Sequence, residues 1–509
     1  MITLKNNIYT CIEIGSFEIK LLVCNFREER LFVLTQKCVA SAGIDRGQIT
    51  NFDKLVNQIK KVKKLAEQDL KQPLKNIVLT IPPIDITIEY VMGRLNLDVK
   101  QPIQTDDVRK LFRQVMEQSH YEGVLPVGLV PRQFKIDENH IVQNPRGLSG
   151  MNLGIEASRI LMSATPVANL VHAVESSGFK VDEIIVGSIA ETLLVLETPE
   201  MYARTCHINI GHGMTSLTIV NDGKIIQART LPIGGRDIIR AIADQFNISE
   251  ELASRLKIRY GQINAHTFEE PSQQVIYIDE QASEMKFITR AMLNAVITEV
   301  VDGIFKNIRQ HIVDELRLRE QEYHYSLSGG VAELPNILTS LQNQLPMAAS
   351  IFRPSMLGIR NTKFSSIIGT AILAHELTLL LGTNPNAQKF EFETPNEVEK
   401  VVTPRFKTKQ DIIPQVEKVS PPKKQVESPT SLKEAIAGVA SVGVEEKSIE
   451  KTKKIPIYDD LIEESAPLLE DAGLEIDETY IDQKLSNSGA LARFFGRILN
   501  ENDEEEKLK

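Results

Sequence analysis

The chain has 509 residues, of which 42% are hydrophobic and 25% charged, a composition typical of soluble globular proteins. This length is enough for roughly three structural units. The net charge of -10 argues against general nucleic-acid binding, which requires a basic face. The four cysteines form no CxxC pair, so we expect reduced thiols and neither a zinc site nor a disulfide framework.

Two segments of the sequence bear on membrane insertion. Residues 1–9 lack a basic region followed by an apolar run, so we expect no secretory signal and a cytosolic protein. The longest apolar stretch, Ser366–Gly382, carries His375 and Glu376 and falls short of the roughly 20 apolar residues that span a bilayer. We predict a buried helix that ends at Gly382.

Residues 9–24 and 205–220 share one pattern, in which a glycine turn joins two apolar strands. The first turn contains Gly15 and Ser16, and the second, about 196 residues later, contains Gly211 and Gly213. Glycine turns can present backbone N–H groups to an anion. One such hairpin would be read as a plain structural turn, but the pair indicates a duplicated fold whose two lobes enclose a phosphate chain.

Two further glycine turns follow the second hairpin. The segment 231–235 precedes helical patterns at 237–246 and 250–260, and the latter contains Lys257. The segment 323–332 reads as a strand that ends at Gly329-Gly330 and leads into a helix. Helix N-termini favour anions, so these turns are candidates for further walls of a nucleotide cleft. The apolar stripe of residues 288–312 predicts a long core helix instead.

The C-terminal quarter of the chain changes character. Residues 384–487 are rich in Pro, Lys, Glu, Ser and Thr, which predicts a disordered linker. A helix is predicted at 488–500, and its apolar face consists of Leu491, Phe494, Phe495, Ile498 and Leu499. We interpret it as a membrane-surface helix, although a partner groove or docking onto the folded body are alternatives. The acidic tail at 501–509 would weaken binding to anionic lipid.

These turns resemble those of the actin/Hsp70/hexokinase ATP-binding superfamily. The resemblance rests on Gly15-Ser16, Gly211-x-Gly213-x-Thr215, Pro232–Gly235 and Ser328–Ala332, in that order. Within the superfamily the chain is similar to the FtsA family of bacterial cell-division proteins. That similarity rests on the stretch Asn144–Gly150, on Ala253–Gly261 and on the terminal amphipathic helix.

The resemblance implies an α/β, actin-like duplicated fold with two lobes around a nucleotide cleft and an FtsA-type extra subdomain. The expected boundaries are 1–84 for the first part of the first lobe, 85–163 for the extra subdomain, 164–200 for the rest of the first lobe, and 201–383 for the second lobe, including a smaller subdomain at about 235–322.

The resemblance also implies the site, cofactors and partners. ATP is expected in the cleft, with Mg²⁺ held through the nucleotide. The expected partners are the C-terminal peptide of the tubulin-like protein FtsZ, other copies of the chain and membrane lipid, at the cytoplasmic face of the plasma membrane at the division site. The nucleotide-binding candidates are Gly15, Ser16, Phe17, Gly211, Gly213, Met214, Thr215, Gly234, Gly235, Lys257, Gly329, Gly330 and Val331.

The sequence departs from the superfamily pattern at its acidic positions. Glu13 and Asn209 stand where the two phosphate turns normally carry Asp, and an amide cannot accept a proton or neutralise Mg²⁺ as a carboxylate does. Ser216 and Ser254 replace two further acids. We therefore predict little or no ATPase activity, and expect Glu13→Asp with Asn209→Asp to raise any turnover.

Two alternative functions come from the same superfamily. A small-molecule kinase would need a carboxylate base, and Asn209 removes the obvious candidate. An actin-like protein of the PilM or MreB type is the other alternative, and the Asn144–Gly150 stretch and terminal helix favour FtsA over it.

Overall fold

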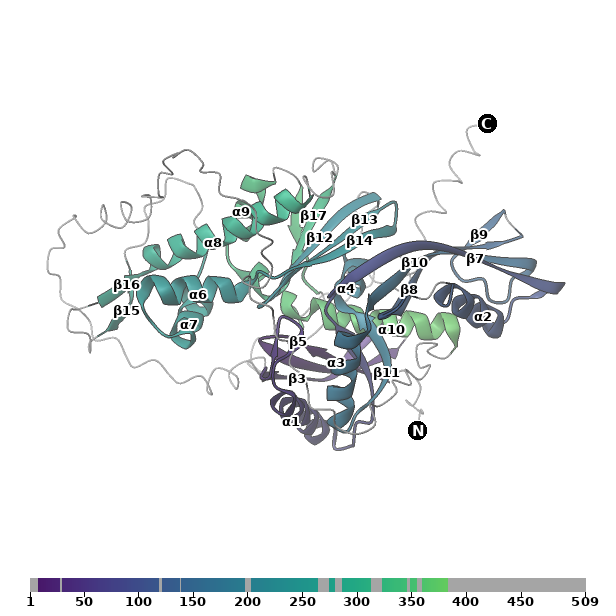
Figure 1. Cartoon of the computed structure of the whole chain (residues 1–509), viewed down its shortest axis with the longest axis horizontal. Coiled ribbons are helices and arrows are strands. Elements are labelled where there is room, and N and C mark those ends of the chain that lie inside the picture. Colours follow the sequence, from purple (N-terminus) through teal and green to yellow (C-terminus); the bar gives the residue numbers. More distant parts are fainter. Residues whose placement is uncertain are drawn as a thin grey trace, which may run out of the picture. The chain divides into compact units, whose positions relative to one another are not determined.

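The structure is a computed structural model that describes residues 8–382 except 28–29, 119–120, 138, 197–202, 264–273, 280–285, 313–322, 346–347 and 355–358. The predicted linker at 384–487, the terminal helix at 488–500 and the acidic tail at 501–509 lie outside the described residues. Figure 1 shows the arrangement of the elements.

The first lobe is built on a five-stranded sheet. In spatial order its strands are β11 (Lys180–Val186), β6 (Asn76–Ile81), β1 (Ile8–Ile14), β2 (Glu18–Arg27) and β3 (Arg30–Ala40). The chain runs antiparallel from β1 to β2 to β3, whereas β6 is parallel to β1 and β11 is parallel to β6. The short hairpin of β4 (Ile44–Asp45) and β5 (Gln48–Ile49) follows β3.

The second lobe repeats this sheet. Its strands, in spatial order, are β14 (Lys224–Leu231), β13 (Thr215–Asn221), β12 (Arg204–Ile210), β17 (His324–Ser328) and β18 (Ala349–Ile351). Here too the first three strands in the chain are antiparallel neighbours, and the next two are parallel. The same strand order in both halves confirms the predicted duplicated, actin-like α/β fold.

Helices pack against the first sheet. They are α1 (Phe52–Leu70), α3 (Ala164–Ser176), α4 (Gly187–Val195) and α10 (Ser365–Leu381). α1 begins at the Asn51 cap, whose side chain accepts a hydrogen bond from the Lys54 amide, and it buries one face against β2 and β3. α4 and α10 pack on each other, and α10 also contacts β1 and β6.

α10 is the apolar stretch that the sequence predicted to be a buried helix. The segment Thr362–Leu381 is long and apolar enough to cross a membrane, but 83% of its apolar window is buried inside the protein. The helix ends at Gly382, whose φ of 65° is the left-handed conformation that glycine adopts most easily. The prediction of a core helix ending at Gly382 is confirmed.

The described residues of the second lobe include four helices. They are α6 (Gly235–Phe246), α7 (Glu250–Tyr260), α8 (Arg290–Gln310) and α9 (Ile337–Gln344), accompanied by the strand pair β15 (Val275–Asp279) and β16 (Lys286–Thr289) and the short turns η3 (Gly330–Glu333) and η4 (Thr362–Phe364). The side chains of α6, α7, α8 and α9 share one core with β12, β13 and β17. Most of the apolar stripe predicted at 288–312 lies in or against this core, and Met292 is the exception.

A third sheet lies between β6 and α3 in the chain. Its strands, in spatial order, are β7 (Ile86–Pro102), β10 (Ser149–Ser163), β8 (Val124–Ile136) and β9 (His140–Val142), and α2 (Thr105–Met116) packs on it. The buried Arg159 guanidinium bonds to the last carbonyls of α2 and forms an ion pair with Glu89. We call this unit the inserted subdomain.

The inserted subdomain also contacts the β13–β14 hairpin of the second lobe. Arg132 Nε donates to the Asp222 carbonyl at 3.3 Å, and Ser158 Oγ donates to the Ile225 carbonyl at 3.3 Å. Val220, Ile225 and Ala228 of that hairpin are buried in the core of the first lobe and the inserted subdomain. Among the described residues, the second lobe therefore packs against the rest of the body through this hairpin, through contacts of β12, β13 and β14 with α4, and around the cleft described next.

Candidate functional site

The two glycine turns have the same local geometry. In the first, the Gly15 amide donates to the Glu18 carbonyl at 3.1 Å, and in the second, the Gly211 amide donates to the Met214 carbonyl at 2.9 Å. Each bond closes a turn of four residues between two antiparallel strands. The turns are therefore equivalent parts of the duplicated fold.

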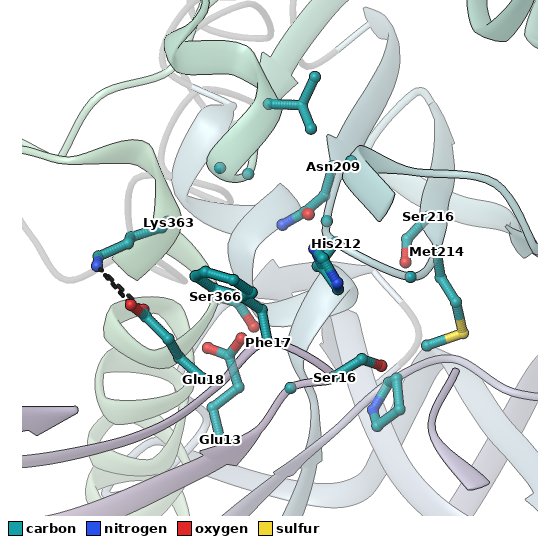
Figure 2. Close-up of a pocket in the computed structure, with 18 of the residues that line it drawn as sticks. Glu13, Ser16, Phe17, Glu18, Asn209, His212, Met214, Ser216, Lys363 and Ser366 are labelled. Carbon is teal, nitrogen blue, oxygen red and sulfur yellow. Dashed lines mark hydrogen bonds and ion pairs between the residues drawn. The ribbon is translucent and has the colours of Figure 1, made fainter. Parts of the chain in front are cut away.

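The tips of the two turns meet across one cleft. The rings of Phe17 and His212 lie 4.9 Å apart between their centroids, with a tilt of 39°. A Cβ on Gly213 would lie 3.1 Å from Ser16 Oγ, so a larger residue there would have to displace the Ser16 side chain. Ser16, Phe17 and His212 line a cavity (Figure 2). Its volume is about 430 Å³, a size suited to a small ligand.

Most of the predicted nucleotide-binding residues line this cavity. Those that do are Gly15, Ser16, Phe17, Gly211, Gly213, Met214, Gly235, Lys257, Gly329, Gly330 and Val331. Both positions that depart from the superfamily pattern at the turns, Glu13 and Asn209, also line it, as do Ser216 and Ser254.

Thr215 and Gly234 are not among the lining residues, and both support the second turn from behind. Thr215 is fully buried, and its hydroxyl donates to the Ile233 carbonyl at 2.8 Å. A Cβ on Gly234 would lie 2.7 Å from the Gly211 carbonyl oxygen. Glycine is needed at 234 for this close approach of the two backbones.

The N-terminus of α6 holds the second turn through its backbone. The Gly235 amide donates to the Gly211 carbonyl at 2.9 Å, and the Arg236 amide donates to the His212 carbonyl at 2.7 Å. These bonds fix the backbone of the turn and do not involve its side chains. The segment 231–235 therefore positions the turn as well as lining the cleft.

The Gly329–Gly330 turn forms another wall of the cleft. Gly329 has a φ of 85°, and a Cβ there would lie 2.5 Å from the Ile210 carbonyl oxygen, so this position requires glycine. A Cβ on Gly330 would meet nothing within 4 Å. The wall is thus bare backbone, which allows a ligand to approach closely.

Glu13 is paired with the cation opposite it on β2. Its Oε1 accepts a hydrogen bond from Lys20 Nζ at 2.8 Å, and Lys20 also donates to the Lys363 carbonyl at 2.5 Å. Burial alone would lower the pKa of Lys20, but the Glu13 carboxylate raises it above its usual value. Within the described part of the chain, the buried Glu13 Oε2 has no hydrogen-bond partner. An unsatisfied carboxylate oxygen at the cleft suits a water bound to Mg²⁺.

Asn209 is bonded away from the cleft. Its Nδ2 donates at 2.6 Å to Oε2 of Glu191, a fully buried carboxylate on α4, and His207 Nε2 lies 3.6 Å from the same oxygen. Burial alone would raise the pKa of Glu191, but His207 and Asn209 hold it below its usual value. The carboxylate bonded to Asn209 therefore lies on α4, where it is fully buried and does not line the cleft.

Lys257 is the cleft cation best placed for an anion. Among the described residues it forms no ion pair, and its Nζ lies 3.4 Å from the Gly235 carbonyl oxygen. Burial lowers the pKa of Lys257 to about 8. By contrast, Lys363 pairs with Glu18 at 3.0 Å. A phosphate near Lys257 would supply the counter-charge that the described residues do not provide there.

Sequence reasoning missed four polar residues of this region: Lys20, Lys363, His212 and Glu191. Lys20 was open to prediction, because a hairpin with a four-residue turn places it opposite Glu13. No sequence pattern could pair Glu191 with Asn209, since they belong to different lobes. No group of three or more His, Cys, Asp or Glu that could hold a metal directly was found among the described residues.

Comparison with known proteins identifies the family. The family model "Cell division protein FtsA" matches residues 206–369, and the model "SHS2 domain inserted in FTSA" matches residues 85–161. The FtsA protein of Bacillus subtilis (strain 168) is 23% identical over 77% of this chain and 88% of its own length. The FtsA of Enterococcus hirae is 25% identical over 72% of this chain and 82% of its own length.

This chain is a divergent member of the FtsA family. It is thus an actin-like cell-division protein, as the resemblance of its motifs indicated, and the inserted subdomain corresponds to the region matched by the SHS2 model. Solved structures similar to it include a PilM–PilN type IV pilus biogenesis complex, with a TM-score of 0.49 and 14% identity over 72% of this chain and 98% of that one. Another is MreB5 of Spiroplasma citri bound to AMPPNP, with a TM-score of 0.46 and 11% identity over 74% of this chain and 99% of that one.

Proposed function

We propose that this FtsA-family protein is a cell-division scaffold that binds ATP between its lobes, polymerises, and links FtsZ to the membrane. The observation that carries the proposal is the pair of equivalent turns facing each other around one cavity, in a chain of this family. The binding of FtsZ and of lipid is proposed because the family resemblance implies it. The resemblance also implies the location, at the cytoplasmic face of the membrane at the division site.

Nucleotide binding is supported by the chemistry of the cavity lining. Bare glycine turns come from both lobes, and Lys257 offers a cation that lacks a counter-charge among the described residues. Mg²⁺ would be held through the nucleotide and through waters on Glu13, where it would neutralise phosphate charge. Bound nucleotide would close the cleft and so favour polymerisation.

Hydrolysis is expected to be very slow or absent. General-base catalysis needs a carboxylate that takes a proton from the attacking water. Position 209 carries an amide, which is bonded to Glu191, and the charge of Glu13 is balanced by Lys20 on its Oε1 side, which makes the carboxylate a weaker base. Ser216 at the cleft wall offers a hydroxyl in place of an acid. Turnover on the order of tens per second, within the range of ordinary enzymes, would contradict this assignment.

A titration of the full chain with ATP, with and without Mg²⁺, tests nucleotide binding. We expect saturable binding that Mg²⁺ strengthens. Gly213→Val should weaken it, because the added side chain would crowd Ser16 and occupy space at the cavity wall. Gly303→Ala, on α8 where an added Cβ meets nothing within 4 Å, is the control and should bind normally. Failure of the unmodified chain to bind ATP would refute this part of the proposal.

Membrane attachment is assigned to the predicted helix at 488–500. Its five apolar side chains would give modest, reversible lipid affinity, and polymerisation would make the attachment stable by linking many helices. Liposome sedimentation tests this with the full chain, a chain ending at Asn487 and the double variant Phe494→Glu/Phe495→Glu. We expect only the full unmodified chain to pellet, and equal pelleting of all three would remove the membrane role.

FtsZ is the expected partner at the inner face of the membrane. Co-purification with the C-terminal peptide of FtsZ, beside a pilus-assembly peptide as the alternative, distinguishes the FtsA assignment from a PilM-type role. We expect retention of the FtsZ peptide alone. Retention of the pilus peptide would favour the alternative.

A further inference from the structure

His212 occupies a position in the cleft that the proposed nucleotide site does not yet explain. It lies at the tip of the second turn, with its ring against Phe17 from the first turn (Figure 2). Its backbone is fixed, because its carbonyl accepts the Arg236 amide at 2.7 Å. Within the described residues no hydrogen bond holds its imidazole. The side chain, unlike the backbone, is therefore free to bond a ligand.

Charged groups face His212 from three elements. Arg236 on α6 pairs with Asp45 on β4 at 3.0 Å, and Glu250 and Lys257 lie on α7. The neighbouring Arg46 approaches Asp237 at 3.7 Å. Both arginines therefore have acidic partners, and Lys257 is left as the cation whose charge is not compensated among the described residues.

This environment keeps His212 neutral at physiological pH. Burial, followed by repulsion from Lys257 and Arg236, lowers the pKa of His212 to about 4, and Asp45 and Glu250 only partly offset these effects. A polyphosphate entering between the turns would reverse the sign of the local charge. An opposite charge within about 4–6 Å favours the protonated form of a histidine.

We propose that His212 is a phosphate-responsive residue that takes up a proton when a nucleoside polyphosphate binds between the two turns. The imidazole gains one proton from solvent and then donates a charge-assisted hydrogen bond to a phosphate oxygen. The Phe17 ring lies 4.9 Å away between centroids, tilted by 39°, within the range of a cation–π contact that further favours the charged imidazolium.

The consequence is that ATP affinity depends on pH through this side chain. The nucleotide-bound protein holds more protons than the free protein, so affinity rises as pH falls toward the pKa of free His212. This inference rests on the proposed nucleotide binding, but it adds a property that binding alone does not require.

Isothermal titration calorimetry of the full chain with ATP at about pH 7, in two buffers of different ionisation enthalpy, measures the proton uptake. Because ATP also titrates near this pH, the readout is the difference between the unmodified chain and His212→Gln. We expect the unmodified chain to take up about half a proton more than His212→Gln does, or a larger excess. The matched control is His324→Gln, since burial also lowers the pKa of His324, and this side chain bonds Ser350 outside the cleft.

The possible results separate the two proposals. Equal proton uptake by the unmodified chain and His212→Gln, with ATP bound in both, overturns the role of His212 and leaves nucleotide binding intact. No ATP binding to the unmodified chain overturns both. If His212→Gln fails to fold by circular dichroism, the unmodified chain decides: an ATP affinity that does not rise between about pH 8 and pH 6 refutes the proposal.

Discussion

Asn209 Nδ2 donates a hydrogen bond to Glu191 Oε2 at 2.6 Å and so joins β12 of the second lobe to α4 of the first. Glu191 is fully buried, and His207 Nε2 lies 3.6 Å from the same oxygen. An amide at 209 therefore fits a carboxylate that has no water to solvate it. Asn209, which stands where the superfamily pattern has Asp, therefore serves as a hydrogen-bond donor to Glu191.

We expect Asn209→Asp alone to destabilise the protein by about 3–5 kcal/mol at neutral pH, because it buries two carboxylates in contact. The loss should shrink as pH falls, since a shared proton then relieves the repulsion. The double variant Asn209→Asp/Glu191→Gln reverses the polarity of the bond and should recover most of the stability. Urea unfolding at several pH values measures both.

The contact between positions 209 and 191 should also affect any ATPase activity gained by mutation. The gain in turnover expected from Glu13→Asp and Asn209→Asp should appear only when Glu191→Gln is present, because the carboxyl group introduced at position 209 is otherwise partly protonated. A phosphate-release assay on the variants with and without Glu191→Gln compares them. Equal stability and equal turnover with or without Glu191→Gln would show that the contact is unimportant.

Gly369 on α10 allows the two helices between the lobes to pack closely. A Cβ there would lie 2.7 Å from the backbone of Ala190 on α4, and backbone atoms cannot move aside as a side chain can. We expect Gly369→Ala to lower the free energy of unfolding by about 1–3 kcal/mol. The matched variant Gly303→Ala, in open space on α8, should raise it by about 0.5–1 kcal/mol. A change of the same sign in both would refute the packing explanation.

The sequence revealed the parts of the fold that depend on local pattern. The glycine turns, the strand pairs around them and α7 at 250–260 follow from residues close together in the chain. The start of the predicted helix at Ile288 was two residues early, because Ile288 pairs with Tyr277 in the β15–β16 hairpin and Thr289 caps α8. Long-range polar partners such as Glu191 and Asn209 left no local signal, since each depends on how the lobes pack.

Glu156 in the inserted subdomain should control part of the acid unfolding. Burial opposes its charge, but hydrogen bonds from Lys135 and Tyr90 lower the pKa of Glu156 to about 2, below its usual value of 4.5. A lowered folded-state pKa gives stability above the unfolded-state pKa that is lost as pH falls toward the folded-state pKa.

Glu156→Gln should therefore flatten the loss of stability between pH 4.5 and about 2. Urea midpoints measured across this range test it. Asp106→Asn is the control, because its carboxylate is mostly exposed in its ion pair with Arg109, and it should leave the acid limb unchanged. An acid limb that is equally steep in Glu156→Gln and the unmodified chain would contradict the assignment.

Lys257 should account for a large part of the affinity for nucleotide. Burial lowers its pKa to about 8, so in the free protein the ammonium begins to lose its proton just above neutral pH. A bound phosphate would favour the charged form, and the affinity of the unmodified chain for ATP should fall as pH rises above 8.

Lys257→Met should bind ATP about 10- to 100-fold more weakly and lose this alkaline dependence, because about 1.4–2.8 kcal/mol is typical of one charge-assisted hydrogen bond. Lys37→Met, which removes an ion pair with Asp69 outside the cleft, should bind as the unmodified chain does. If Lys257→Met retains both the affinity and its alkaline decline, the phosphate chain does not lie beside α7, and the cation of the site must be sought at Lys20.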